Sequence, residues 1–291
     1  MVKSVAIALA SILLSTTLVA QPQGQSEPKE ISDLRKAAEQ GDAQKQWDLG
    51  GRYYSGKGVA EDHSEALKWY SKAAEQGDPE KQFRVGFMYW LERNNVEAAK
   101  WYRKAAEQGV VLAQSDLGDM YRDGKGVPQN YVEAAKWYHR AAENETVEKN
   151  GLIPTQAFSQ YSLGAQYESG LGVLQDYVEA AKWYRKAVES GDSMAVFSLY
   201  SLCLNGKSTK QDCADVAKWL SILANHDDSD LYPSVRATSG SNVSQYFLGT
   251  LYEKGLGVPQ NYVEAAKWYR KAADQGRLPG TPLKVSDSRP S

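Results

Sequence analysis

The sequence predicts an all-α protein built as a right-handed α-solenoid of about six helix–turn–helix repeats. Two observations carry this prediction: a tryptophan that recurs at regular spacing, and a Leu-Gly-x-x-Tyr motif that precedes it in most copies. The intervals between the tryptophans are 32, 36, 46, 36 and 49 residues, which gives a base period of 36 with one shortening and two insertions. The tryptophans are Trp69, Trp101, Trp137, Trp183, Trp219 and Trp268. The copies cover about residues 42–77, 78–109, 110–145, 156–191, 192–227 and 241–276.

The first half of each copy predicts a helix that another helix approaches closely. Leu163 and Tyr167 are four residues apart, so they share one face of a helix. A glycine in the middle of a helix is unfavourable, and its recurrence at positions such as Gly164 indicates a close crossing there. A Gly-x-Gly segment follows, and its first glycine, as in Gly170, suits a left-handed helix C-cap.

The second half of each copy predicts a helix that begins with a capping box. Asn130 and Glu133 have the required spacing, and the same pattern recurs at Asp176 and Asn261. Alanine and aromatic positions cover more than one face of this helix, as expected when neighbouring repeats pack on both sides.

The two ends of the chain have a different composition. Residues 1–20 combine Lys3, a short apolar run and small residues before Gln21, which predicts a cleaved secretory signal peptide. The apolar run from Val5 to Leu14 is too short to span a bilayer. We expect a flexible leader at 21–31, the solenoid at 32–276 and a disordered, proline-containing tail at 277–291.

The charge balance excludes one class of partner. The chain has 34 basic and 36 acidic residues, so it lacks the basic excess that nucleic-acid binders use to neutralise phosphates. We therefore expect protein partners, no nucleic acid and no stable membrane insertion after signal cleavage. The expected location is the bacterial periplasm or the outside of the cell.

The repeat pattern resembles a known family. Segments such as Leu117-Gly118-x-x-Tyr121, followed by Gly124-x-Gly126-Val127 and then Ala135-Lys136-Trp137-Tyr138, resemble the Sel-one-like repeat, a relative of the tetratricopeptide repeat. The resemblance covers about residues 32–276 and implies adaptor, assembly or host-contact roles. Two copies depart from the pattern: the second lacks the Gly-x-Gly segment, and the fifth has Tyr200 in place of the glycine.

The fifth copy has one cysteine on each of its two predicted helices. Cys203 stands where other copies have the Leu-Gly-x-x-Tyr tyrosine, and Cys213 stands where Tyr131, Tyr177 and Tyr262 are found. In an oxidising compartment this register predicts a Cys203–Cys213 disulfide between the two helices. A catalytic cysteine is the alternative, but no Cys-x-x-Cys or neighbouring histidine supports it.

One set of side chains is a candidate for partner binding. An aromatic residue stands two positions before the Leu-Gly pair, or its equivalent, in five copies, and Ser115 replaces it in the third. We call these residues the aromatic set: Trp47, Phe83, Tyr161, Phe197 and Tyr246. They either form a surface for a peptide or loop, or pack between adjacent repeats. The insertions at Glu148–Gln156 and Asp227–Asn242 are a second candidate.

The remaining polar residues predict no catalytic or metal centre and no cofactor. His63, His139 and His226 are too far apart in the repeat to suggest a metal site, and no His-Glu-x-x-His motif is present. Glu-x-x-Lys pairs such as Glu133 and Lys136 are typical of exposed helix surfaces.

The sequence therefore favours an exported protein–protein interaction module. The resemblance leaves two alternatives open. One is a β-lactam-binding or hydrolysing enzyme like some cysteine-rich relatives of this repeat, although the Ser-x-x-Lys motif of the usual β-lactam enzymes is missing. The other is an immunity or inhibitor protein that binds one exported toxin.

Overall fold

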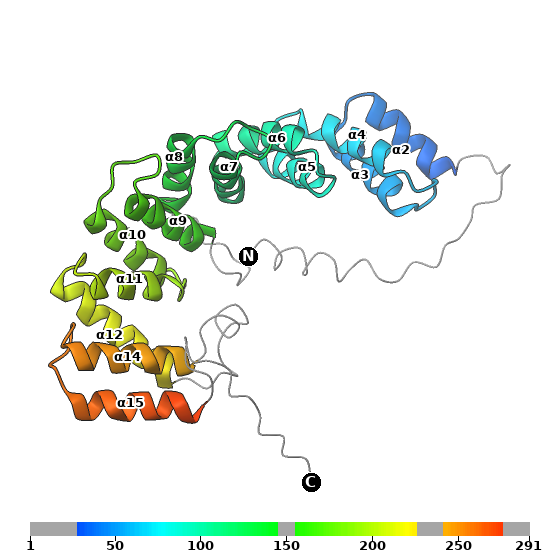
Figure 1. Cartoon of the computed structure of the whole chain (residues 1–291). Coiled ribbons are helices and arrows are strands. Elements are labelled where there is room, and N and C mark those ends of the chain that lie inside the picture. The colour runs from blue at the N-terminus through cyan, green and yellow to red at the C-terminus, as the bar shows by residue number, and fades with distance from the viewer. Residues whose placement is uncertain (1–27, 145–154, 226–240, 276–291) are drawn as a thin grey trace, which may run out of the picture. The chain divides into compact units, whose positions relative to one another are not determined.

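The computed structural model describes residues 28–144, 155–225 and 241–275. Within these ranges the chain forms thirteen α-helices and no strand, which confirms the predicted all-α solenoid of hairpins (Figure 1). No described helix has both the length and the apolar character that crossing a bilayer requires. The expected signal peptide, most of the leader and the tail from 277 onward lie outside the described residues, as do most of both insertions.

Six hairpins account for twelve of the helices. The first helices of the hairpins are α3 (Ala43–Ser55), α5 (Pro79–Leu91), α7 (Val111–Asp123), α9 (Thr155–Ser169), α11 (Ala195–Leu204) and α14 (Ser241–Lys254). The second helices are α4 (His63–Ala74), α6 (Asn95–Glu107), α8 (Tyr131–Ala142), α10 (Tyr177–Glu189), α12 (Lys210–Asn225) and α15 (Tyr262–Asp274). The chain divides into two compact units, Met1–Val85 and Gly86–Ser291, which we describe separately.

The thirteenth helix, α2 (Lys29–Glu39), corrects the expected boundary of the leader. Residues 29–31 are helical rather than flexible, because the side chain of Ile31 is buried at 1% exposure against Gly58. The run from Arg35 to Gly41 repeats the run from Arg103 to Gly109 residue for residue. By this identity helix α2 corresponds to the second helix of a repeat, and it packs on α3.

The second helices begin as the capping motif predicts, with one difference. The side chain of Asn130 accepts hydrogen bonds from the backbone N–H groups of Val132 and Glu133, and Asp176 and Asn261 do the same in their own helices. The Glu133 carboxylate forms an ion pair with Lys136 instead of turning back to the cap. The cap N–H of Asn130 donates to the carbonyl of Tyr121 across the hairpin, so that donor is already satisfied.

The recurring glycines lie where the two helices of a hairpin are closest. A Cβ atom on Gly164 would lie 2.8 Å from the ring of Tyr184, the residue after the tryptophan of the same hairpin. The same contact joins Gly50 to Tyr70, Gly86 to Tyr102, Gly118 to Tyr138 and Gly249 to Tyr269. The predicted close crossing is confirmed, and its cause is a tyrosine ring that fills the space a side chain would need.

A row of glutamines connects neighbouring hairpins within each unit. In unit 2 the Gln114 side chain donates from Nε2 to the carbonyl of Ala106, at the C-terminal end of the preceding second helix, over 3.0 Å. Carbonyls at helix ends lack an intrahelical partner, so this bond satisfies an otherwise open acceptor. The same bond joins Gln46 to Ala38, Gln82 to Ala74, Gln160 to Ala142 and Gln245 to Ala224.

Candidate partner-binding face

The aromatic set lies on the first helices and is partly exposed at every position. In unit 1 the ring of Trp47 lies 4.4 Å from the ring of Tyr70, between centroids. In unit 2 the rings of Tyr161 and Tyr184 are 5.4 Å apart, and those of Tyr246 and Tyr269 are 5.3 Å apart. These three members therefore pack on the tyrosine of their own hairpin and keep part of their surface open to solvent.

Phe197 packs differently because the fifth hairpin lacks that tyrosine. Its equivalent is Leu220, and the Phe197 ring lies 5.7 Å from Phe247 of the following hairpin instead. The expected packing between adjacent repeats is thus seen at this position. Phe83 is partly exposed in unit 1, like Trp47.

Unit 1 contains an open groove beside Trp47. Its volume is about 760 Å³, and it is lined by α2, by α3 and by the ring of Tyr70. Leu34, Trp47 and Tyr70 supply apolar surface, while Asp48 and Arg52 supply charge. Arg52 forms an ion pair with Glu30 at the rim. Six of the twelve lining residues are charged, three of each sign, so the groove combines apolar surface with polar groups that can orient a ligand.

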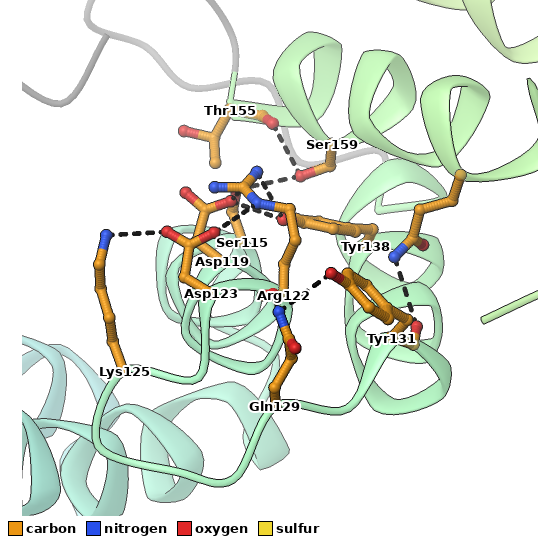
Figure 2. A network of polar contacts seen from close by, with 11 residues as sticks. Ser115, Asp119, Arg122, Asp123, Lys125, Gln129, Tyr131, Tyr138, Thr155 and Ser159 are labelled. Atoms are coloured by element: carbon orange, nitrogen blue, oxygen red, sulfur yellow. Dashed lines mark hydrogen bonds and ion pairs between the residues drawn. The ribbon is translucent and has the colours of Figure 1, made fainter. Parts of the chain in front are cut away.

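The third hairpin replaces the aromatic residue by a polar network. Figure 2 shows Ser115 beside Ser159 of the next hairpin, where their hydroxyl oxygens are 3.2 Å apart. In the same view the Tyr138 hydroxyl donates to Asp119 over 2.6 Å, and Arg122 lies 2.8 Å from Asp119. At the position where the other hairpins carry an aromatic ring, Ser115 therefore makes a hydrogen bond to the next hairpin, and Asp119, one turn further along α7, contacts Tyr138 and Arg122.

The pKa values of the carboxyl groups on α7 shift in different directions. Burial, together with the negative charge of Asp119, raises the pKa of Asp116 to about 7, although a hydrogen bond with Tyr102 opposes the shift. Burial also raises the pKa of Asp119. The hydrogen bond from Arg122 lowers the pKa of Asp123. Perturbed pKa values mark functional sites or structural ion-pair networks, and the paired groups here fit the second case.

The fifth hairpin contains a disulfide between Cys203 and Cys213, the pair expected from the sequence. Their Cα atoms are 5.6 Å apart, and Gly257 of the next hairpin packs against the backbone of Cys213. The buried Asp212 forms an ion pair with Arg185 of the preceding hairpin and accepts a hydrogen bond from the backbone N–H of Thr209. The disulfide thus lies beside contacts to both neighbouring hairpins.

The described histidines make local contacts. The ring of His63 stacks on Tyr54, and His139 lies 3.2 Å from Glu143. His226 lies outside the described residues. Within the described ranges, no group of three or more His, Cys, Asp or Glu side chains is arranged to hold a metal ion.

The comparison with known families identifies the repeat. The model described as "Sel1 repeat" matches residues 34–42, 46–78, 82–110, 111–145, 157–192 and 242–276. These matches include part of α2, which the tryptophan spacing did not predict as a partial copy. They omit the fifth copy, which the structure nevertheless shows as the hairpin α11–α12. The sequence signal for α2 was its identity with residues 103–109.

Two solved structures have similar sequences and folds. One is a protective antigen present in uropathogenic Escherichia coli strains and described as displaying an SLR fold; it is 32% identical, with a TM-score of 0.58 over 85% of this chain and 49% of that chain. The other is a Sel1 repeat protein from Oxalobacter formigenes, 32% identical, with a TM-score of 0.52 over 84% of this chain and 65% of that chain.

A curated relative matches only a short segment. DAP3-binding cell death enhancer 1 of Rattus norvegicus is 49% identical over 43 residues, which is 15% of this chain and 8% of that protein. The chain spans less than two thirds of the length of each of these three proteins. From the matched repeats and the hairpin geometry, the chain belongs to the Sel1 repeat family, which generally mediates protein–protein interaction.

Proposed function

We propose that this chain is an exported protein–protein interaction module that binds its partner through the exposed faces of its first helices and has no catalytic activity. The observation that carries the proposal is the aromatic set. Five hairpins present a partly exposed aromatic ring at one helical position, and four of these rings pack on another aromatic ring.

The packing of these rings suits a binding surface. Trp47 and Tyr161 are held by buried tyrosines, so their rings lose little conformational freedom when a partner covers them. Aromatic residues that are fixed before binding are the usual anchors of protein interfaces, and truncation of one typically weakens binding by about 2 kcal/mol or more. Both units carry such anchors, and the proposal does not depend on how the units are placed.

Export is supported by two features. The order of basic, apolar and small residues in 1–20 is that of a secretory signal peptide. The Cys203–Cys213 disulfide fits an oxidising compartment, where such bonds persist. The proposed location is the periplasm or the extracellular medium.

A quantitative capture experiment tests the binding function. The tagged chain is expressed with its own N-terminus, crosslinked to periplasmic and secreted proteins, and compared with a Trp47→Ala/Phe83→Ala variant and a Tyr161→Ala/Tyr246→Ala variant. We expect one protein to be enriched by the native chain and at least tenfold less by one of the variants.

The matched control is Leu174→Ala, which removes an apolar side chain that is 90% exposed and outside the aromatic set. The control should capture the same protein as the native chain. If capture by both aromatic variants equals that of the control, the proposed face is wrong. A single stoichiometric toxin as the captured protein would make the chain an inhibitor, and hydrolysis of a chromogenic β-lactam would contradict the absence of catalysis.

A further inference from the structure

The groove in unit 1 lies where internal hairpins place a tyrosine. In unit 2 two of the tyrosines that follow the tryptophan, Tyr102 and Tyr184, reach forward to the residue two positions before the glycine, or its equivalent, of the next hairpin. Tyr102 shares a side-chain hydrogen bond with Asp116, two residues before Gly118. The Tyr184 hydroxyl oxygen shares a side-chain hydrogen bond with Ser198, two residues before Tyr200, and the same hydroxyl donates to Glu168 of its own hairpin. Two internal interfaces therefore pair a phenol hydroxyl with a polar side chain at this position.

The interface between α2 and α3 has an aspartate that can accept a hydrogen bond but no tyrosine that donates to it. Asp48-Leu49-Gly50 has the same sequence as Asp116-Leu117-Gly118, so Asp48 is equivalent to Asp116. The identity of residues 35–41 with 103–109 places Leu34 at the position of Tyr102. A leucine is shorter than a tyrosine and has no hydroxyl group, so the space beyond it stays open. Leu34 and Asp48 both line the 760 Å³ groove.

We infer that this groove accepts the side chain of a tyrosine from a partner protein, with the ring beside Trp47 and the hydroxyl donating to Asp48. The inference rests on the proposed function and names the residue type that one of its sites recognises. Trp47 and Tyr70 lie 4.4 Å apart with their ring planes tilted by 50°, and a third ring can pack against this pair in an edge or offset arrangement.

Asp48 retains an oxygen for the incoming hydroxyl. Its Oδ1 atom accepts a hydrogen bond from Gln44 over 2.8 Å, whereas its Oδ2 atom is 3.8 Å from Lys45, which is too long for a hydrogen bond. The side chain is 40% exposed, so a ligand can reach it. The groove lining has three cationic and three anionic residues, so its total charge does not select the ligand. With the hydroxyl placed against Asp48, however, the carboxylate accepts from a neutral hydroxyl and repels a phosphate at that position, so this pose specifies unmodified tyrosine.

The chain's own sequence favours a partner as the source. Residues 1–27, which lead into α2, contain no Phe, Trp or Tyr, and neither do residues 145–154 and 276–291. Tyr232 is the one tyrosine outside the described ranges. A Tyr232→Phe variant therefore tests whether the chain's own tyrosine occupies the groove.

A titration with small probes tests the inference. N-acetyl-tyrosinamide, N-acetyl-phenylalaninamide and N-acetyl-phosphotyrosinamide are added to the full chain, and the indole N–H signal of Trp47 is followed by NMR after assignment with a Trp47→Phe variant. We expect the tyrosine probe to bind about five- to tenfold more tightly than the phenylalanine probe, because only its hydroxyl satisfies Asp48. The phosphotyrosine probe should bind more weakly than either. Equal affinities for the tyrosine and phenylalanine probes would overturn the inference.

Two variants separate the groove from the fold. Leu34→Tyr recreates the internal arrangement, so it should fill the groove, abolish the tyrosine-probe response and raise the Tm. Leu174→Tyr, at an exposed leucine, is the matched control and should leave the response unchanged. Asp48→Ala should remove the preference for tyrosine over phenylalanine and keep the helical circular dichroism of the native chain, which preserves a readout if Leu34→Tyr does not fold. A response that persists in a folded Leu34→Tyr variant contradicts the inference.

The same variants show which of the two proposals fails. If Leu34→Tyr still captures the partner while the aromatic variants lose it, the interaction function stands and the tyrosine groove is wrong. If Tyr232→Phe shows a stronger tyrosine-probe response than the native chain, the groove takes the chain's own Tyr232, and assignment to a partner is overturned.

Discussion

Two neighbouring hairpins of unit 2, α9–α10 and α11–α12, fill the same space with different residues. In α9–α10 the glycine is Gly164 and the ring of Tyr184 lies against it. In α11–α12 the same two positions are Tyr200 and Leu220, so the large side chain has moved to the other helix. Both Tyr200 and Leu220 are buried, and the Tyr200 ring stacks on Phe247 at 4.2 Å. A large residue is therefore accommodated at the glycine position in the hairpin whose facing tyrosine is replaced by leucine, and its ring packs on the following hairpin.

The contact to the preceding hairpin changes along with this crossing. In a regular interface Arg103 of α6 hydrogen-bonds the hydroxyl of Tyr121 in α7. At the fifth hairpin that tyrosine is Cys203, and the equivalent arginine, Arg185, forms an ion pair with Asp212 instead. Asp212 stands where Asp176 caps α10, but α12 begins earlier, at Lys210. Two replacements of tyrosine by cysteine, at Cys203 and Cys213, thus accompany a disulfide, a different ion pair and a shifted helix start.

The largest expected effect comes from moving the fifth hairpin's residues into the fourth. Gly164→Tyr alone places a second ring where Tyr184 already lies, so we expect it to lower the free energy of unfolding by more than about 3 kcal/mol. Adding Tyr184→Leu recreates the Tyr200–Leu220 pair and should restore about 2 kcal/mol of that loss. Urea denaturation of the native chain, both single variants and the double variant measures the coupling. A double variant no more stable than Gly164→Tyr would show that the exchange depends on other residues of the fifth hairpin.

Loss of the disulfide should have the next largest effect. The bond closes a loop of ten residues, for which the chain-entropy model gives a stabilisation of about 3 kcal/mol. Cys203→Ser/Cys213→Ser should therefore lower the free energy of unfolding by about this amount and accelerate hydrogen exchange in α11 and α12. Reductant should have the same effect on the native chain and none on the double variant. Unchanged exchange in α11 and α12 after reduction would show that the Arg185–Asp212 contact holds the hairpin without the disulfide.

These hairpins also show which contacts could be predicted from the sequence and which could not. The period, the glycine crossing and the cysteine register depend on which residues share a helix face, and the repeat itself displays that information. The Arg185–Asp212 ion pair and the Tyr102–Asp116 hydrogen bond depend on how far long side chains extend between hairpins, which spacing within one copy does not show. The glutamine row could have been predicted from the repeat, because glutamine stands three residues before the Leu or Val of the motif in five of six copies.

The residue that hydrogen-bonds the tyrosine hydroxyl should cause a smaller, pH-dependent difference in stability between these interfaces. At Tyr184 the forward partner is the neutral Ser198, whereas at Tyr102 it is Asp116, whose pKa is raised to about 7. A carboxyl with a folded pKa above its unfolded value near 4 binds more protons in the folded state, so stability falls as pH rises from about 4 to 7. Asp116→Asn removes this loss and should be about 1–2 kcal/mol more stable than the native chain at pH 8 and equally stable at pH 4.

Asp123→Asn is the control of opposite sign. Arg122 lowers the pKa of Asp123, so this carboxylate contributes stability at neutral pH that is lost as pH falls below about 4. The variant should be less stable than the native chain at pH 8. Thermal unfolding at both pH values measures each difference, and a pH dependence that survives in Asp116→Asn would assign the effect to Asp119, whose pKa is also raised.

The smallest expected effect concerns the glutamine row, where the fifth hairpin again departs from the others. Val196 stands at the glutamine position there, so this hairpin lacks the bond to the preceding helix end and still packs on α10. Gln114→Val transfers that residue to the third hairpin and removes the bond to Ala106, but it also removes a buried Oε1 atom that has no partner among the described residues. The lost bond and the relieved oxygen nearly offset each other, so we expect a loss of only about 0.5–1 kcal/mol in urea denaturation. A loss above about 2 kcal/mol would mean that the glutamine orders the helix end, and the fifth hairpin would then depend on its disulfide to compensate.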